Sequence, residues 1–320
     1  MIEVCVVGEI NLDLILYGLP KDLVLDREHL ASNMAFTLGS SSAIFAHNLC
    51  TLGTRVGFIS KTGRDPLGKM AVERLSAAGV DISRMKQGSG QTSTGLTVVL
   101  PYPQHRYMLT YPGTMFEMHY SDIDMDYVRS ARHFHLSSYF LHRALRPQIL
   151  HLFRQAKEAG LSTSLDTNDD PENEWAPDLL EVLKHVDVFL PNEREAKKVA
   201  RTDDLSQALN FLAGLAKVVV VKRGSSAAIC RRGEEQWSLA PPAVKIVDDI
   251  GAGDTFDSGF IHMYLLGAKL EDCLAFANLA AAYSVTQEGG TEAFRDRSGL
   301  FNFIREQWNL MGRGALRVKG

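Results

Sequence analysis

The residues with the clearest chemical meaning form a short run near the C-terminal end of the chain, Gly251-Ala252-Gly253-Asp254. Apolar residues recur at helical spacing directly after it, so the sequence predicts a tight turn that leads into a helix. A helix N-terminus presents unpaired backbone N–H groups and a positive dipole end, and glycines let the backbone approach an anion closely. A carboxylate in such an anion site is unfavourable unless it takes a proton. An anion site beside a base is what phosphoryl transfer to a hydroxyl requires.

Two other interpretations of this run are open. It could be a plain glycine turn in which Asp254 only favours the helix dipole. It could also be a dinucleotide-binding GxGxxG motif, but Phe256 stands at the third glycine position, the run comes late in the chain, and a carboxylate lies inside the cradle. The phosphate-loop pattern GxxxxGK[ST] does not occur in the sequence.

Asn192 and Glu195 follow an apolar run that ends at Leu190. An Asn at the N-cap with a Glu three residues later is typical of a capping box, and the pair taken alone favours that interpretation. The same two side chains would lie at the C-terminal end of a strand. There they could hold Mg²⁺ through its water ligands, beside phosphates.

Asn11 and Asp13 follow the first apolar run, and alternate residues of an extended segment face the same way. An amide and a carboxylate on one side suit the hydroxyls of a polyol, because one donates and accepts while the other accepts. An Asx turn is the alternative. Gly39 and Ser40 precede an apolar helical pattern, and their small size would permit the close approach of a ligand.

Polar residues follow two further apolar runs. Asp166 and Asn168 come after the run 161–165, where they suit a substrate, a metal or a loop. Lys222 ends a run of four valines, where its ammonium could face phosphates or be solvated. His133 and His135 alternate on another run, and a zinc site would need more ligands at defined spacing, so we expect a structural role for them.

The composition is that of an ordinary globular enzyme, with 320 residues, 45% hydrophobic and 22% charged. The net charge of −4 comes from interspersed residues of both signs, which argues against nucleic-acid binding. The four cysteines form no CxxC pair, so we expect reduced thiols. The N-terminus does not resemble a signal peptide and no apolar stretch approaches the ~18 residues of a membrane span. We therefore expect a cytoplasmic protein without a membrane partner.

Short apolar runs recur along the chain, at 1–7, 56–59, 133–137, 161–165, 186–190 and 218–221. Helical patterns such as 145–160 and 204–217 lie between them. This alternation predicts a three-layer α/β fold, in which a mainly parallel sheet is covered on both faces. Ligands of such sheets bind beyond the C-terminal ends of the strands.

Two segments, 14–39 and 92–113, interrupt this pattern, and the second has the alternation of a hairpin. We interpret them as a small β lid inserted into a catalytic body made of 1–13, 40–91 and 114–320.

Together these features resemble the ribokinase-like (PfkB) carbohydrate kinases. The resemblance covers about residues 3–295 and rests on the Gly-Glu-x-Asn-x-Asp of Gly8–Asp13, the Asn192-x-x-Glu195 element and the signature Asp248-x-x-Gly-Ala-Gly-Asp254. It implies a Rossmann-like body with a β-sheet lid and transfer of the ATP γ-phosphate to a hydroxyl of a sugar.

The resemblance also implies a role for each matching residue. Asp254 is the base, and the amides of Gly251, Ala252 and Gly253 form the anion hole. Asn192 and Glu195 place Mg²⁺ and the phosphates, and some members use a monovalent cation near the position of Asp248, which makes K⁺ a candidate. The substrate side is formed by Asn11, Asp13, Gly39, Ser40, Asp166 and Asn168. The nucleotide side is formed by Lys222, Gly224 and Asn278.

The chain departs from the family pattern at the sugar-reading end. Ile44 replaces a substrate-binding Asn, and Asp170 stands where an Arg often serves anionic substrates. A carboxylate there would repel an anion at close range, which favours a neutral acceptor. Asp249-Ile250 replaces the usual Thr-Thr, which argues against the cation site.

Two alternatives to a sugar kinase remain. One is a nucleoside kinase with an adenosine-like acceptor on the same scaffold, and the other is a non-catalytic ligand-binding relative. Lids of this family often pair between subunits, so the resemblance also implies a homodimer as a candidate assembly.

Overall fold

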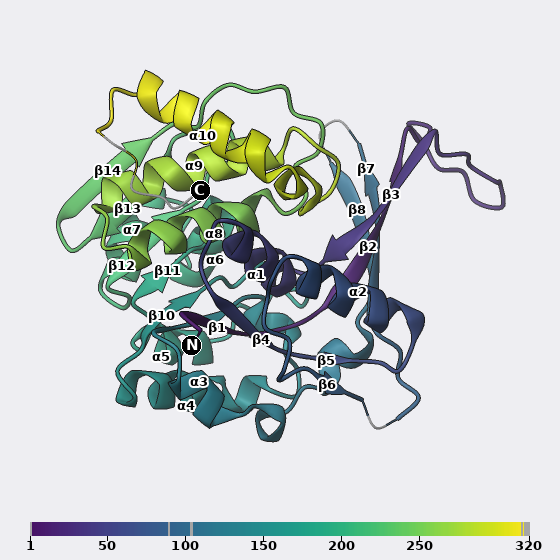
Figure 1. Cartoon of the computed structure of the whole chain (residues 1–320), viewed down its shortest axis with the longest axis horizontal. Coiled ribbons are helices and arrows are strands. Elements are labelled where there is room, and N and C mark those ends of the chain that lie inside the picture. Colours follow the sequence, from purple (N-terminus) through teal and green to yellow (C-terminus); the bar gives the residue numbers. More distant parts are fainter. Residues whose placement is uncertain (1, 89, 103–104, 315, 317–320) are drawn as a thin grey trace.

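The computed structural model describes residues 2–88, 90–102, 105–314 and 316. A central sheet of eight strands in this part of the chain has the order β14-β13-β12-β11-β10-β9-β1-β4 (Figure 1). Its strands are β1 (Val4–Val7), β4 (Val56–Ile59), β9 (His133–Leu136), β10 (Ser162–Leu165), β11 (Val188–Phe189), β12 (Val218–Val221), β13 (Ala228–Arg232) and β14 (Glu235–Leu239). The strands from β4 to β12 pair in parallel, which confirms the prediction, and β13 and β14 add antiparallel edges.

Helices cover both faces of this sheet. One face carries α1 (Ser41–Thr51), α2 (Pro66–Ala77), α8 (Ala252–Leu265), α9 (Leu270–Ser284) and α10 (Arg297–Leu310). The other carries α3 (Met125–Arg129), α4 (Arg146–Glu158), α5 (Asp178–Leu183), α6 (Glu193–Ala200) and α7 (Leu205–Ala213). The helical patterns 145–160 and 204–217 are therefore confirmed as α4 and α7.

Side chains that alternate along the buried strands contribute to two hydrophobic cores, one on each face of the sheet. In β1, Val4 and Val6 pack into the core under α1, α8 and α9, whereas Cys5 and Val7 pack into the core under α4 and α5. This is the period of two that a strand imposes on its side chains. Because both faces of the sheet are buried, these strands are continuous apolar runs in the sequence.

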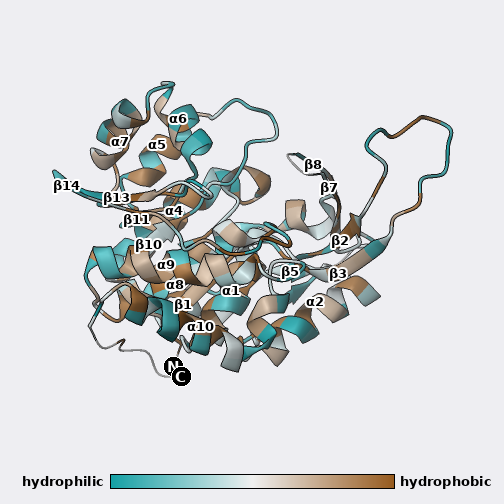
Figure 2. Cartoon of the chain, turned by 90° about the horizontal axis from the view of Figure 1, so that it is seen from above, coloured by the Kyte–Doolittle hydropathy of each residue, from teal (hydrophilic) through white to brown (hydrophobic). Residues whose placement is uncertain are grey.

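A second, four-stranded sheet stands beside the body with the order β3-β2-β7-β8, and we call it the small sheet. Its strands are β2 (Asn11–Tyr17), β3 (Asn33–Gly39), β7 (Gly95–Pro101) and β8 (Arg106–Tyr111). The hairpin expected in 92–113 is confirmed, because β7 and β8 pair antiparallel. Strand β2 already begins at Asn11, three residues before the expected boundary of this sheet. The loop between β2 and β3 projects away from the molecule (Figure 2).

Shorter elements complete the described residues. Strands β5 (Lys61–Thr62) and β6 (Lys86–Gln87) form a two-stranded sheet, and 3-10 helices span Gly113–Glu117, Tyr120–Asp122, Tyr139–Leu141 and Glu292–Arg295. None of the described helices is long and apolar enough to cross a bilayer. All four cysteines are free thiols, as expected.

The two histidines of β9 have the structural role that we expected. His133 hydrogen-bonds to the hydroxyls of Ser162 and Ser164, and His135 hydrogen-bonds to those of Ser164 and Ser137. Burial lowers the pKa of both imidazoles, so they stay neutral within this chain of hydroxyls.

Candidate active site

The predicted site residues gather where several parallel strands end. Asn11 follows β1, Asp166 and Asn168 follow β10, Asn192 follows β11, and Lys222 follows β12. A parallel bridge joins Asn192 to Lys222, and the amide of Glu193 donates to the Lys222 carbonyl at 3.0 Å. The N-terminus of α8, which carries Asp254, meets the same edge, because the Lys222 ammonium lies 2.9 Å from Oδ2 of Asp257, one turn further along this helix. These side chains therefore lie together at the edge where ligands of such sheets bind.

The turn before α8 has the backbone that its glycines predict. Gly251 is the N-cap and lies in the left-handed region with φ of 71°. A Cβ atom there would lie 2.7 Å from the Cα of Gly290, so this position requires glycine. Helix α8 begins at Ala252, whose amide donates to the Asp249 carbonyl at 3.2 Å. One of the three amides expected in the anion hole is thus partly used by the turn itself. The amides of Gly253 and Asp254 lie in the first turn of α8, where they have no intrahelical acceptor.

Asp254 is a buried carboxylate at the start of a helix, with a residue exposure of 8%. Burial is the main cause that raises its pKa to about 7, and the charge of Asp166 adds to the effect. Lys222 and a hydrogen bond from Ser41 act in the opposite direction. A carboxyl that titrates near neutrality is suited to take a proton from a hydroxyl.

Asn11 and Asp13 lie inside β2 rather than in an Asx turn, and both side chains turn over Gly39 from the same face of the strand. Burial, followed by the charges of Asp254 and Asp248, raises the pKa of Asp13 to about 7. The Nδ2 of Asn11 donates to the Thr97 hydroxyl at 3.0 Å, whereas its buried Oδ1 has no hydrogen-bond partner among the described residues. That oxygen is available to a ligand hydroxyl.

Gly39 pairs with Asn11 in the small sheet, and a Cβ atom on Gly39 would lie 2.1 Å from Oδ1 of Asp13. Glycine here lets both polar side chains turn over the backbone. Ser40 caps α1 with a φ of 68°, and its hydroxyl donates to the Glu9 carbonyl at 2.6 Å. Its side chain therefore supports the site rather than opening into it.

Asn168 also adopts a left-handed backbone, with φ of 51°. Its Nδ2 donates to the hydroxyls of Ser41 and Ser138, the latter at 2.8 Å. Ser138 in turn contacts Glu9, a residue whose importance our sequence analysis missed although it stands in the Gly-Glu-x-Asn-x-Asp motif. The Glu9 carboxylate accepts hydrogen bonds from Ser42 and Ser138 and pairs with His142. Burial opposes its charge, but these partners prevail and lower its pKa to about 2.

Lys222 is not solvated. Its ammonium lies 2.8 Å from Oδ2 of Asp166 and 2.9 Å from Oδ2 of Asp257, and the side chain is 11% exposed. Burial opposes its charge, but these two carboxylates outweigh it and raise the pKa of Lys222. A Cβ atom on Gly253 would lie 3.6 Å from the ammonium, so this cation stands beside the N-terminus of α8.

Asp257 is a second residue that our sequence analysis missed. It lies one turn after Asp254 on α8, and this three-residue spacing on one helix face was the available signal. Its Oδ1 is buried and has no hydrogen-bond partner among the described residues. Burial raises its pKa well above the ordinary value, although Lys222 acts against that rise.

Asn192 and Glu195 form the capping box. The amide of Glu195 donates to Oδ1 of Asn192, and the amide of Asn192 donates to the Glu195 carboxylate, both at 2.9 Å. Glu195 is also buried, and its burial together with the charge of Asp166 raises its pKa to about 8. The capping interpretation is therefore confirmed. A capping box alone, however, does not require that the Glu195 carboxyl be buried near the charge of Asp166.

The remaining predicted site residues are Asn278, Gly224 and Asp248. Asn278 lies on α9 and its Nδ2 donates to the Leu239 carbonyl at 2.9 Å. Gly224 follows β12 with φ of 57°, and a Cβ atom there would meet nothing within 4 Å. Asp248 precedes the turn and accepts hydrogen bonds from three donors.

The structure shows what surrounds Ile44 and Asp170, the two residues that depart from the family pattern. Ile44 is buried, and its Cδ1 lies 2.7 Å from the position of a Cβ on Gly290, so it packs against the glycine turn. Asp170 accepts hydrogen bonds from the amides of Glu172, Glu174 and Trp175. Its carboxylate is thus engaged in its own loop. This weakens the direct repulsion from which we expected a neutral acceptor.

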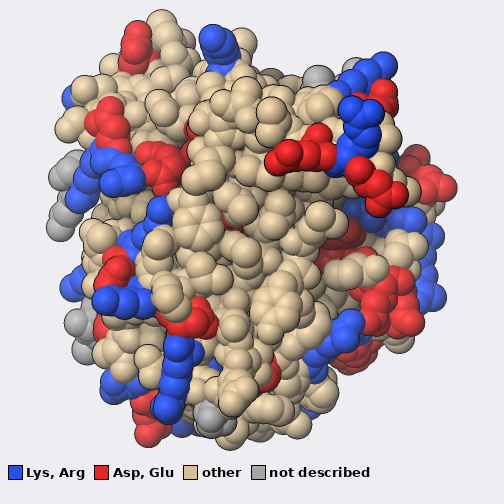
Figure 3. Space-filling model, turned by 90° about the vertical axis from the view of Figure 1, so that its right-hand side faces the viewer, with Lys and Arg blue, Asp and Glu red and all other residues tan. Residues whose placement is uncertain are grey.

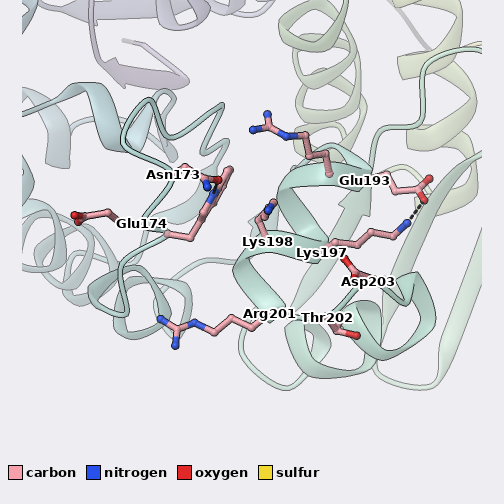
Figure 4. A pocket seen from close by; sticks show the side chains of 10 residues that line it. Asn173, Glu174, Glu193, Lys197, Lys198, Arg201, Thr202 and Asp203 are labelled. Carbon is pink, nitrogen blue, oxygen red and sulfur yellow. Dashed lines mark hydrogen bonds and ion pairs between the residues drawn. The ribbon is translucent and has the colours of Figure 1, made fainter.

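An open cleft of about 640 Å³ lies between that loop and the outer face of α6 (Figure 4). It is lined by Asn173, Glu174, Trp175, Glu193, Arg194, Lys197, Lys198, Arg201, Thr202 and Asp203. None of these is a predicted site residue, and the buried Glu195 faces away from the cleft. The candidate site is therefore the cluster at the strand ends and not this hollow.

A three-layer body with a second sheet beside its strand ends, and a buried Asp at a glycine-led helix N-terminus, define a phosphotransferase of the ribokinase type. The pfkB family carbohydrate kinase model matches residues 1–297, so the chain belongs to this family. It is a sugar kinase, which transfers a phosphoryl group to a hydroxyl acceptor.

Similar proteins agree with this membership. The chain is 28% identical over 244 residues to an uncharacterized sugar kinase of Archaeoglobus fulgidus, covering 76% of this chain and 96% of that protein. It is 27% identical to 5-dehydro-2-deoxygluconokinase of Clostridium perfringens, with 84% of each covered. Ribokinase of Arabidopsis thaliana, solved with ribose and ATP, superposes with a TM-score of 0.80 at 26% identity, covering 95% of this chain and 99% of that one.

Proposed function

We propose that this protein transfers the γ-phosphate of ATP to a hydroxyl of a neutral carbohydrate, with Asp254 as the general base. The observation that carries the proposal is the buried Asp254 carboxyl, whose pKa is raised to about 7, at the N-terminus of α8. Amides of Gly251, Ala252 and Gly253 would bind the transferring phosphoryl group, and the Lys222 ammonium beside Gly253 would add a positive charge.

The acceptor would lie between β2 and α8. The unpaired Oδ1 of Asn11 and the carboxyl of Asp13 would bind its hydroxyls, with Gly39 giving room for both. Ser40, Asp166 and Asn168 would form the surrounding wall. The four-stranded small sheet, which carries Asn11 and Asp13, would act as a lid that excludes water.

The nucleotide would lie on the side of Lys222, Gly224 and Asn278, and Mg²⁺ beside Asn192 and Glu195. The donor set fits this metal, because Asn192 and Glu195 offer oxygen ligands at a strand end, and burial, with the Asp166 charge adding to it, raises the pKa of Glu195 to about 8, a cost that a nearby divalent cation would offset. When bound, Mg²⁺ would supply charge neutralisation at the phosphates.

A neutral acceptor is favoured by the charges around Asp13. The carboxylates of Asp254 and Asp248 act on it, and the Arg106 guanidinium that opposes them is paired with Asp249. An additional carboxylate on the acceptor would be repelled there. Because relatives are named 5-dehydro-2-deoxygluconokinase and 2-dehydro-3-deoxygluconokinase, neutral sugars must be compared directly with sugar acids.

The test is an acceptor screen that measures ADP release from ATP and Mg²⁺, with neutral sugars, sugar acids and nucleosides in parallel. We expect turnover with a neutral sugar, and loss of that turnover in Asp254→Asn. Turnover with a sugar acid alone would overturn the neutral acceptor, and turnover with a nucleoside alone would overturn the sugar. Ligand-induced thermal shifts without ADP release would favour a non-catalytic relative.

The outer face of the small sheet is the surface on which we propose that a second copy packs. Met34, Tyr107, Leu109 and Tyr111 lie on this face, opposite Asp13, and are between 54% and 62% exposed. Figure 3, which looks onto this side of the molecule, shows a broad central area without charged side chains. Exposed apolar surface of this kind is typical of a protein interface.

A further inference from the structure

Asp248 organises the entry to the glycine turn. Its Oδ1 accepts a hydrogen bond from the amide of Ile250 at 2.9 Å, and its Oδ2 accepts one from the amide of Gly289 at 2.9 Å. Gly251 of the turn packs on Gly290, the neighbour of Gly289. This one carboxylate therefore joins the turn to the chain segment against which it packs.

A third donor reaches Asp248 from the small sheet. The hydroxyl of Tyr17 donates to Oδ2 of Asp248 at 2.6 Å. Tyr17 is the last residue of β2 and lies on the same face of that strand as Asn11 and Asp13. Burial, with Asp248 adding to it, raises the pKa of the Tyr17 phenol, so the hydroxyl keeps its proton as a donor. One strand thus carries both the acceptor-binding residues and a contact to the turn.

Two neighbouring contacts join the same parts of the molecule. The guanidinium of Arg106, on β8, lies 2.6 Å from Oδ1 of Asp249. The Nδ2 of Asn33, which pairs with Tyr17 in the sheet, donates to Glu288 at 2.8 Å. Both contacts are more exposed than that of Tyr17, so they stabilise the arrangement less.

Asp248 has little coordinating capacity left for a monovalent cation. A carboxylate has about four lone-pair positions, and three of those of Asp248 already accept hydrogen bonds. The N–H and O–H dipoles that point at these oxygens would repel a cation. The following residues offer no further neutral oxygen ligand in their side chains, because Asp249 is paired with Arg106 and Ile250 is apolar.

We propose that Tyr17 is a positioning residue that holds the glycine turn through Asp248 when the small sheet is closed, and that this turn therefore works without K⁺. This inference rests on the proposed role of the turn as the anion hole. The small sheet would then have two roles, because β2 would bind the acceptor and would also order the backbone that binds the phosphoryl group.

The experiment compares Tyr17→Phe, which removes a single hydroxyl, with Tyr127→Phe, a control on α3 whose hydroxyl also donates to a carboxylate, Oδ2 of Asp81, at 2.7 Å. The first readout is amide hydrogen exchange of peptides that cover 248–256, in the full-length protein without ligands. We expect faster exchange in Tyr17→Phe and wild-type exchange in the control. Wild-type exchange in both variants would overturn the positioning role, whatever the enzyme activity.

The second readout is steady-state kinetics with K⁺ or with tetramethylammonium at equal ionic strength. A hydrogen bond to a charged group corresponds to about 10- to 100-fold in kcat/KM. We expect a loss of that size in Tyr17→Phe, and no response of the wild type to K⁺. A wild type that requires K⁺ would overturn the cation-free turn. Absence of any kinase activity, with the expected exchange result, would count against the proposed function and not against the role of Tyr17.

Discussion

The carboxyls of Asp13 and Asp254 come from opposite sides of the site, one from β2 and the other from α8, and the charge of Asp254 helps burial to raise the pKa of Asp13 to about 7. Two buried acidic groups in one electrostatic environment hold fewer than two negative charges near neutrality. A hydroxyl placed between them would find one group able to take its proton and another able to orient it.

The role of Asp254 is tested by its conversion to Asn, which keeps the shape of the turn. Loss of a general base lowers kcat by about 10²–10⁴-fold, and we expect KM to change little. Asp272→Asn is a matched control, because Asp272 occupies the same third helical position of α9. A variant Asp254→Asn with wild-type kcat on the true substrate would contradict the assignment.

The pH dependence of stability follows from the same two groups. Their pKa values are about 7 in the folded protein and near 3.8 in the unfolded chain, so the folded state binds more protons between these limits. Their contribution therefore becomes unfavourable as pH rises through this window. We expect Asp13→Asn and Asp254→Asn to melt a few degrees above the wild type at about pH 8, with no difference near pH 4. Thermal unfolding across this range measures it, and equal melting temperatures at about pH 8 would contradict the raised pKa values.

Glu195 has both a structural and a proposed metal-placing role, and Glu195→Gln separates them. A glutamine oxygen can still accept from the Asn192 amide, so the melting temperature should hold within about 2 °C. Loss of the charge should raise the Mg²⁺ concentration for half-maximal activity by about 10- to 100-fold. Glu193→Gln, two positions earlier and paired with the partly buried cations Lys197 and Arg223, is the control. A fall in stability alone would leave only the cap.

Gly39 tests the geometry around the acceptor. In Gly39→Ala the new methyl group would overlap Asp13 Oδ1, so Asp13 must move. A displacement of about 1 Å can cost about 100-fold in activity, and we expect most of it in the KM for the sugar, with nucleotide affinity unchanged. Gly90→Ala is the control, because a methyl group there meets nothing closer than 4.0 Å. Unchanged sugar kinetics in Gly39→Ala would show that Asp13 does not bind the acceptor.

The proposed dimer is tested on β8, where Leu109 and Met108 are both 60% exposed but face opposite sides of the small sheet. Leu109→Asp should place a charge in the interface and convert a dimer into a monomer, while Met108→Asp should leave the mass unchanged. Light scattering after size-exclusion chromatography measures both. A monomeric wild type, or a Leu109→Asp variant that remains dimeric, would contradict this surface.

The sequence determined the local parts of this protein. The strands β4 and β12 occupy the predicted runs 56–59 and 218–221, because a buried parallel strand must be continuously apolar. The turn at Gly251–Asp254 and the cap at Asn192–Glu195 also follow from residue types alone, since each depends on contacts within a few positions.

Only the tertiary structure decided which of these parts meet. No local pattern relates Tyr17 to Asp248, 231 positions apart, or shows that Lys222 is buried between Asp166 and Asp257. The sequence likewise could not show that the Asp170 carboxylate accepts hydrogen bonds from amides of its own loop, because the direction of a side chain depends on the packing around it. The glycine turn before α8 is thus encoded locally, whereas the carboxylates, the ammonium and the hydroxyl around it come from elements that meet only in the folded protein.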